Sequence, residues 1–303
     1  MPEFFFTETD NNQSPEPELQ HPSLKALANF GLAIPAENLD EILSLPRATL
    51  IQSLEATIRQ EMERPIDRDF HDDDFLLFNC LLLLGHLQSA ESLPLILEVL
   101  RLDDEKMNFF FGDYLFENFW QVPMLCGENQ IETLKDFVKA DDVPFVYSQT
   151  TVIVSIEHLA HWIPELKPEV VDCITQLLQY FDDLDADADI DPYLVASIAN
   201  SAANLQIDHC LPIIESLFQK GMMDTLLRGN WKEFQRLWNQ PYRAKQDLHR
   251  DVRTWYQEEG VARATRLQEQ EEEQLQQAEE RIKQQRVKEK KATVQILKEK
   301  HQS

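Results

Sequence analysis

The chain has 303 residues, 43% of them hydrophobic, and a formal net charge of −26 at pH 7. This length allows one large or two average domains with a core that needs no metal or disulfide support. Only 7 glycines are present, which disfavours folds built on Gly-rich phosphate loops, hairpin turns or dinucleotide-binding crossovers.

The charge is divided unevenly along the chain. Residues 1–224 contain 11 Lys and Arg against 41 Asp and Glu, whereas residues 225–303 contain 17 against 13. An acidic body repels nucleic-acid phosphates and acidic lipid surfaces. We therefore expect a basic protein partner, no membrane, and no nucleic acid bound to the body.

The N-terminus and the cysteines indicate a cytoplasmic protein. The segment Met1–Phe6 lacks the basic and apolar regions of a signal peptide, and the most apolar stretch, Phe75–Leu84, is too short to span a bilayer. No Cys-x-x-Cys pair occurs, which argues against a zinc ribbon or a thioredoxin-type site. We expect reduced thiols in the core at all four cysteines, Cys80, Cys126, Cys173 and Cys210.

In chain order, residues 1–22 are acidic and Pro-containing, and we expect them to be disordered. Residues 23–240 follow a rhythm of helix pairs, with residues 23–62 as an N-terminal capping layer. Each pair has an apolar first helix and a second helix that often carries Pro near its start. The expected pairs are 74–87 with 92–102, 114–125 with 130–139, 150–163 with 167–181, and 192–205 with 209–220.

The pairs recur at a regular spacing. Pro94 and Pro168 are 74 residues apart, or two periods of 37, and Pro212 follows after another 44. Helix pairs that recur every 37–47 residues are typical of solenoids, in which neighbouring pairs bury one another's apolar faces. The sequence therefore predicts an all-α fold, a HEAT/armadillo-like α-solenoid of helix pairs.

The chain changes character after Gly229. Trp231, Phe234, Leu237 and Trp238 indicate one further amphipathic helix that caps the solenoid. Residues 241–303 read as a long, charged, solvated helical tail with a weak coiled-coil pattern, because Gln285 and Glu289 interrupt the apolar seam.

Four stretches between residues 23 and 240 resemble the bacterial family of unknown function labelled DUF1186. They are Leu45-Pro46-Arg47 with Leu50 and Leu54, Leu82–Leu100, Phe111-Gly112-Asp113 with Glu117, and Ala202–Gly221. The resemblance implies a HEAT-like helical fold. Many relatives end in a Cys-rich SEC-C zinc motif, but this chain has no Cys after Cys210, so the resemblance implies no zinc here.

An aromatic run supplies the candidate binding residues. A helix cannot bury so many aromatic side chains along one stripe, and aromatic anchors dominate interface energetics. Packing between repeats is the competing interpretation, and Asp113 could simply cap a following helix. The candidate residues are Phe109, Phe110, Phe111, Asp113, Tyr114, Phe116, Glu117 and Trp120.

Two acidic or His-containing clusters could bind a cation. Asp182–Asp191 alternates Asp as a calcium loop does, but Ala188 stands where Gly is needed and Leu194 where a bidentate Glu is needed. Glu157, His158 and His161 lie on one predicted helix, with the histidines opposite its apolar stripe. A solvated loop and a helix surface are the competing interpretations, so we expect neither a metal nor another cofactor.

No motif for nucleotide binding, zinc proteolysis or α/β-hydrolase chemistry is present. The sequence favours a non-enzymatic scaffold whose acidic solenoid binds a basic or helical protein partner. The C-terminal helix would add a second contact or self-association. The alternative is a metal-dependent hydrolase that uses the His, Asp and Glu clusters.

Overall fold

The structure, a computed structural model, describes residues 21–66, 75–112, 114–186, 188–238, 251–258 and 262. Every regular element within these ranges is a helix, which confirms the all-α class. None of the described helices is long and apolar enough to cross a membrane.

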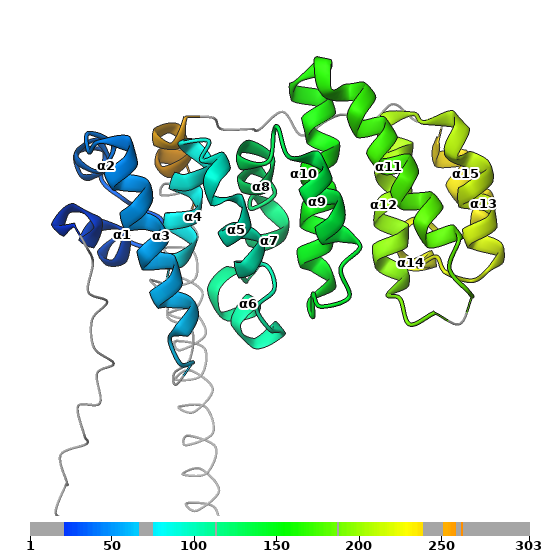
Figure 1. The fold of residues 1–303 in the computed structure, drawn as a ribbon, viewed down its shortest axis with the longest axis horizontal. Coiled ribbons are helices and arrows are strands. Elements are labelled where there is room, and N and C mark those ends of the chain that lie inside the picture. Colours follow the sequence, from blue (N-terminus) through cyan, green and yellow to red (C-terminus); the bar gives the residue numbers. More distant parts are fainter. Residues whose placement is uncertain are drawn as a thin grey trace, which may run out of the picture.

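The first described residues form a layer of helices that covers one end of the described part of the molecule (Figure 1). This layer comprises the 3₁₀ helix η1 (Pro22–Leu24), α1 (Lys25–Asn29), α2 (Ala36–Leu43) and α3 (Arg47–Glu63). Its contact with the next helix is made by α3 and α1. Leu24, Leu27 and Leu54 are fully buried, so the layer shields an apolar end that would otherwise face water.

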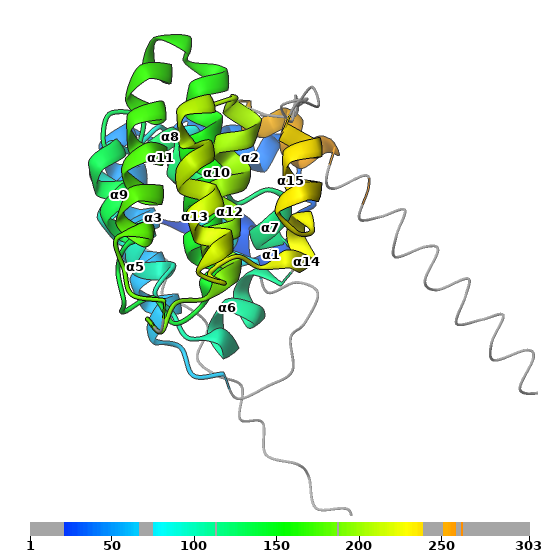
Figure 2. The ribbon, with the colours of Figure 1, turned by 90° about the vertical axis from the view of Figure 1, so that its right-hand side faces the viewer.

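Eight of the other described helices form two rows. In the first row each helix contacts the next, and its members are α4 (Leu76–His86), α8 (Gln121–Cys126), α10 (Val146–Trp162) and α12 (Pro192–Leu205). The second row lies alongside, as Figures 1 and 2 show, and comprises α5 (Leu93–Val99), α9 (Ile131–Val138), α11 (Lys167–Asp182) and α13 (Leu211–Gln219). One continuous apolar core runs between the rows.

Helix starts follow the expected proline pattern. Pro94, Pro168 and Pro212 occupy the first turns of α5, α11 and α13, where a missing N–H costs nothing. All three helices continue directly from single 3₁₀ turns, namely η2 (Ala90–Ser92) before α5, η3 (Pro164–Leu166) before α11 and η4 (Asp208–Cys210) before α13. The predicted second helices of these three pairs are therefore confirmed, with shorter α-helical spans for α5 and α13 and one more residue in α11.

The predicted helix 114–125 is wrong as a single element. The structure instead has α6 (Asp104–Phe111), which ends at Gly112 with φ of 47°, then α7 (Tyr114–Glu117) and α8. A turn separates α7 from α8, because Pro123 has no N–H to donate to the carbonyl of Phe119. The break also lets the adjacent rings of Phe119 and Trp120 both be buried.

The far end closes with α14 (Thr225–Arg228) and α15 (Trp231–Trp238). The predicted helix after Gly229 is confirmed, with Phe234 and Trp238 buried. Residues 252–258 form a further helical stretch, drawn in orange beside α4 in Figure 1. The expected solvated tail is wrong for this stretch, because Trp255 and Tyr256 are buried.

Candidate functional site

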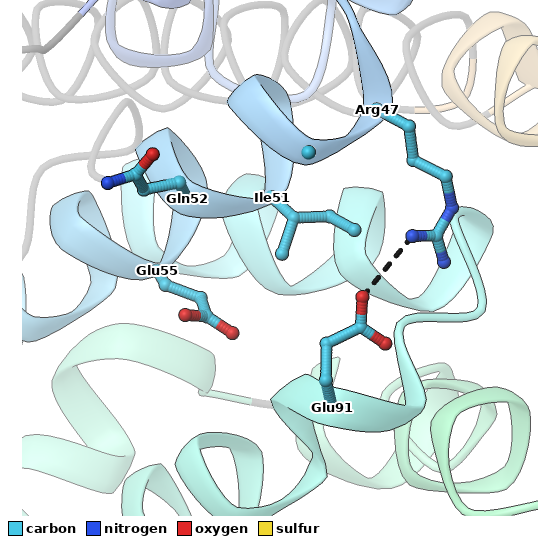
Figure 3. Close-up of a pocket in the computed structure, with 6 residues that line it drawn as sticks. Arg47, Ile51, Gln52, Glu55 and Glu91 are labelled. Carbon is cyan, nitrogen blue, oxygen red and sulfur yellow. Dashed lines mark hydrogen bonds and ion pairs between the residues drawn. The ribbon is translucent and has the colours of Figure 1, made fainter.

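A shallow pocket of about 460 Å³ lies where α3 faces η2 (Figure 3). The Arg47 guanidinium is 3.3 Å from Glu91 and donates to the carbonyl of Leu87 at 2.9 Å. Ser92 Oγ donates to Glu55 at 2.6 Å. The pKa of Glu91 is lowered, first by a hydrogen bond from its own backbone amide and then by Arg47. The charged groups of this pocket are thus already hydrogen-bonded to other residues of the same chain.

The aromatic run lies mainly in the core. Four of the candidate side chains are buried, namely Phe109, Phe110, Phe111 and Trp120, and Tyr114 is half-buried against the core. Phe111 packs edge-on against Phe119 at 4.8 Å, and Tyr114 lies 5.4 Å from Phe78 of α4. These rings therefore lie where the competing interpretation, packing in the core, places them.

The other members of the predicted set are not described. Asp113 and the side chains of Phe116 and Glu117 lie outside the described residues. Gly112 belongs to the C-terminal end of α6. Partner binding by the run stays a prediction, with half-buried Tyr114 as its accessible described member.

A buried carboxylate lies between α10 and α12. Glu157 is 3% exposed. Ser201 Oγ donates to its Oε2 at 2.7 Å, and Asn204 Nδ2 lies 3.0 Å from Oε1 and 3.2 Å from Oε2. Burying a carboxylate is costly unless hydrogen bonds replace its water. These neutral donors hold the carboxylate in a fixed position.

His161 is the neighbour of this carboxylate on α10. Its Nε2 lies 3.8 Å from Glu157 Oε1, one turn further along α10, and its side chain is 24% exposed. Of the side chains described here as contacting Glu157, the imidazole of His161 is the one that can carry positive charge. We call Glu157, His161, Ser201 and Asn204 the Glu157 site.

His158 plays a packing role. Its ring stacks on Trp120 with centroids 4.0 Å apart and an interplanar angle of 24°, and the residue is 1% exposed. The expectation of a surface position opposite the apolar stripe is wrong for His158 and Glu157. The reason is that α10 lies between α8 and α12, so neighbouring helices cover this face as well.

The geometry argues for binding rather than for nucleophilic chemistry. The Ser201 hydroxyl donates to a carboxylate, whereas an activated serine would donate to an imidazole base. An anion fixed by neutral donors is suited to a cationic group such as an ammonium or a guanidinium. Nearby on α12, Asn200 Oδ1 is buried without a hydrogen-bond partner in the described residues.

Neither of the two clusters weighed as cation sites forms a metal site in the described part of the chain. No group of three or more His, Cys, Asp or Glu within it could hold a metal ion. In the acidic loop, Asp187 lies outside the described residues and Asp191 caps α12 by accepting from the Tyr193 amide at 2.8 Å. Glu165 is exposed just beyond α10.

Sequence reasoning missed Ser201 and Asn204. A usable signal was present, because Ser201 follows Glu157 by 44 residues, which lies within the repeat spacing. Residues one repeat apart on equivalent helices of a stacked array are neighbours in space.

Comparisons with known proteins found no match. No family model matches the chain, and no curated protein or solved structure matches it.

Proposed function

We propose that the chain is a non-enzymatic interaction scaffold, a HEAT/armadillo-like α-solenoid that binds a basic protein segment at the Glu157 site. The observation that carries this proposal is a carboxylate that is buried between two helices of the first row and is contacted, among the described residues, by the neutral donors Ser201 and Asn204 and by His161. Because the carboxylate is only 3% exposed, a partner's Lys or Arg would have to displace the His161 side chain to compensate its charge through a charge-assisted hydrogen bond.

The charge of the chain supports the same partner. A net charge of −26 attracts basic segments over distances of about a Debye length, near 8 Å at physiological salt, and raises their association rate. This long-range attraction has little specificity. The Glu157 site would add a fixed contact that selects where the basic segment binds.

The stacking of the rows supports the solenoid part of the proposal. The contacts of α4 with α8, α8 with α10 and α10 with α12 repeat along the chain, and α9, α11 and α13 stack in the same order. Arrays of this kind present extended surfaces to partners. The resemblance to DUF1186, the cytoplasmic location and a second contact through the C-terminal tail stay predictions.

The test uses a fluorescein-labelled nine-residue peptide rich in Lys and Arg, titrated with the full chain at about 150 mM salt and followed by anisotropy. We expect Glu157→Gln to weaken binding about tenfold, the equivalent of roughly 1.4 kcal/mol for one lost charge-assisted contact. Glu165→Gln is the matched control, because Glu165 is exposed and the substitution changes the net charge equally.

Circular dichroism melting establishes that both variants remain folded. Equal weakening by the two substitutions would mean that only overall charge attracts the peptide. Absence of saturable binding by the wild-type chain would refute the proposal outright.

A further inference from the structure

A short C-terminal segment lies on the first helix of the first row, far from the last described helix of the second row. Residues 252–258 are the orange helical stretch beside α4 in Figure 1, and residue 251 directly precedes it. Val252, Trp255 and Tyr256 are 4%, 3% and 2% exposed. An eight-residue stretch of otherwise polar sequence is thus anchored by three apolar or aromatic side chains.

The anchors make specific contacts with α4. The Trp255 ring lies 6.0 Å from the Phe78 ring at an angle of 46°. Tyr256 Oη donates to Asn79 Oδ1 at 3.0 Å, in a fully buried environment. At the rim, Arg253 Nε lies 2.7 Å from Asp40 of α2.

The surface of α4 that receives the segment is oriented by hydrogen bonds that do not involve the segment. Asn79 is fully buried, and its Nδ2 donates to the carbonyls of Leu27 and Gly31, both at 2.9 Å. These two bonds fix the orientation of the amide, so that Oδ1 is left to accept from a hydroxyl. The surface therefore selects a Tyr at this position over a Phe.

The segment caps the start of its own helix but has little further helical stability of its own. Asp251 accepts from the Arg253 amide at 3.1 Å and from Thr254 Oγ1 at 3.2 Å, which caps the first turn. Helices this short are marginal in water because nucleation is unfavourable. Most of the helical stability of residues 251–258 must come from docking on α4.

We propose that the surface of α4 around Phe78 and Asn79 is a docking site for a short helical peptide with an adjacent Trp-Tyr pair. Residues 251–258 occupy it within the same chain as a displaceable ligand. A segment of the same sequence supplied from outside takes its place when the internal copy is disabled. This site lies on α4, apart from the Glu157 site on α10 and α12, and does not depend on it.

The experiment uses the full chain carrying Trp255→Ala and Tyr256→Ala, so that the internal ligand is disabled. The probe is a fluorescein-labelled peptide covering residues 249–260, and binding is followed by anisotropy. We expect the peptide to bind this variant at least tenfold more tightly than the wild-type chain, whose site is occupied. Adding Asn79→Ala to the variant should remove most of that gain.

A control peptide with Trp255 replaced by Ala should not bind. Equal affinity of the wild-type and disabled chains for the intact peptide would overturn the proposal, as would binding that ignores Asn79. Should the double substitution unfold the chain, hydrogen exchange of full-length Tyr256→Phe decides the question. Amides of residues 251–258 should then exchange at least several-fold faster than in the wild type, and unchanged exchange would overturn the proposal.

Discussion

The buried amide of Asn79 gives the sharpest stability prediction. Its side chain makes three hydrogen bonds, to the Leu27 and Gly31 carbonyls and from the Tyr256 hydroxyl. Substitution by Ala removes all three and leaves their partners in a core that water does not reach. With a net value of about 1 kcal/mol for each bond, and a further penalty for stranded groups, Asn79→Ala should cost about 3–5 kcal/mol.

The assay is urea unfolding of the full chain followed by circular dichroism. Asn29→Ala is the matched control, since Asn29 is exposed at the end of α1 and should change stability by less than about 0.5 kcal/mol. Arrays of stacked helix pairs can unfold in parts. Hydrogen exchange in α1 and α4 therefore accompanies the urea curve and locates the loss.

A double-mutant cycle separates the Tyr256 bond from the rest. Tyr256→Phe alone leaves one buried acceptor unpaired and should cost about 1–2 kcal/mol. Combined with Asn79→Ala it should show a coupling energy of about 1 kcal/mol. A cost below about 1 kcal/mol for Asn79→Ala, or a coupling energy of zero, would refute the reasoning.

Three other predictions concern the core. Burial raises the pKa of the Cys126 and Cys173 thiols to about 12. At pH 8 a thiol reagent should therefore label them about a thousandfold more slowly in the folded than in the unfolded chain. Rapid labelling of the folded chain would contradict this. Burial also raises the pKa of Tyr256, so the folded state favours the neutral phenol. The stability it contributes is complete at neutral pH and is lost as the pH rises above about 10, the unfolded value; a urea midpoint unchanged between pH 7 and pH 10.5 would count against it. Gly112 ends α6 with φ of 47°, and Gly112→Ala should cost about 1 kcal/mol in a thermal melt through backbone strain alone, because the nearest atom to an added Cβ, Asn108 O, is 3.9 Å away.

Local patterns were sufficient for helices with clear boundary residues. The range 192–205 predicted for one first helix coincides with α12, because Pro192 starts it, Asp191 caps it and Gln206 ends it in the left-handed conformation. The prediction failed where two local preferences conflict. The apolar run after Tyr114 favours one helix, yet Pro123 and the paired bulk of Phe119 and Trp120 divide it.

Contacts between distant residues gave no local signal. Tyr256 and Asn79 are 177 positions apart, and the charged sequence around Tyr256 resembles a solvated tail. The contacts of the Glu157 site could be predicted in part, because Ser201 and Asn204 lie about one repeat after Glu157 and the repeat spacing can be recognised in the sequence. Which face of α10 is buried could not be read from one helix, since its neighbours on both sides decide it.

The most direct measurement of the central claim is to map where a basic segment binds. A Lys- and Arg-rich peptide with a photoreactive diazirine is irradiated with the full chain, and the crosslinked residues are located by mass spectrometry. The account predicts crosslinks in α10 and α12 around Glu157 and Asn204, reduced by Glu157→Gln and retained in Glu165→Gln. Crosslinks confined to the acidic loop Asp182–Asp191, and insensitive to Glu157→Gln, would contradict it.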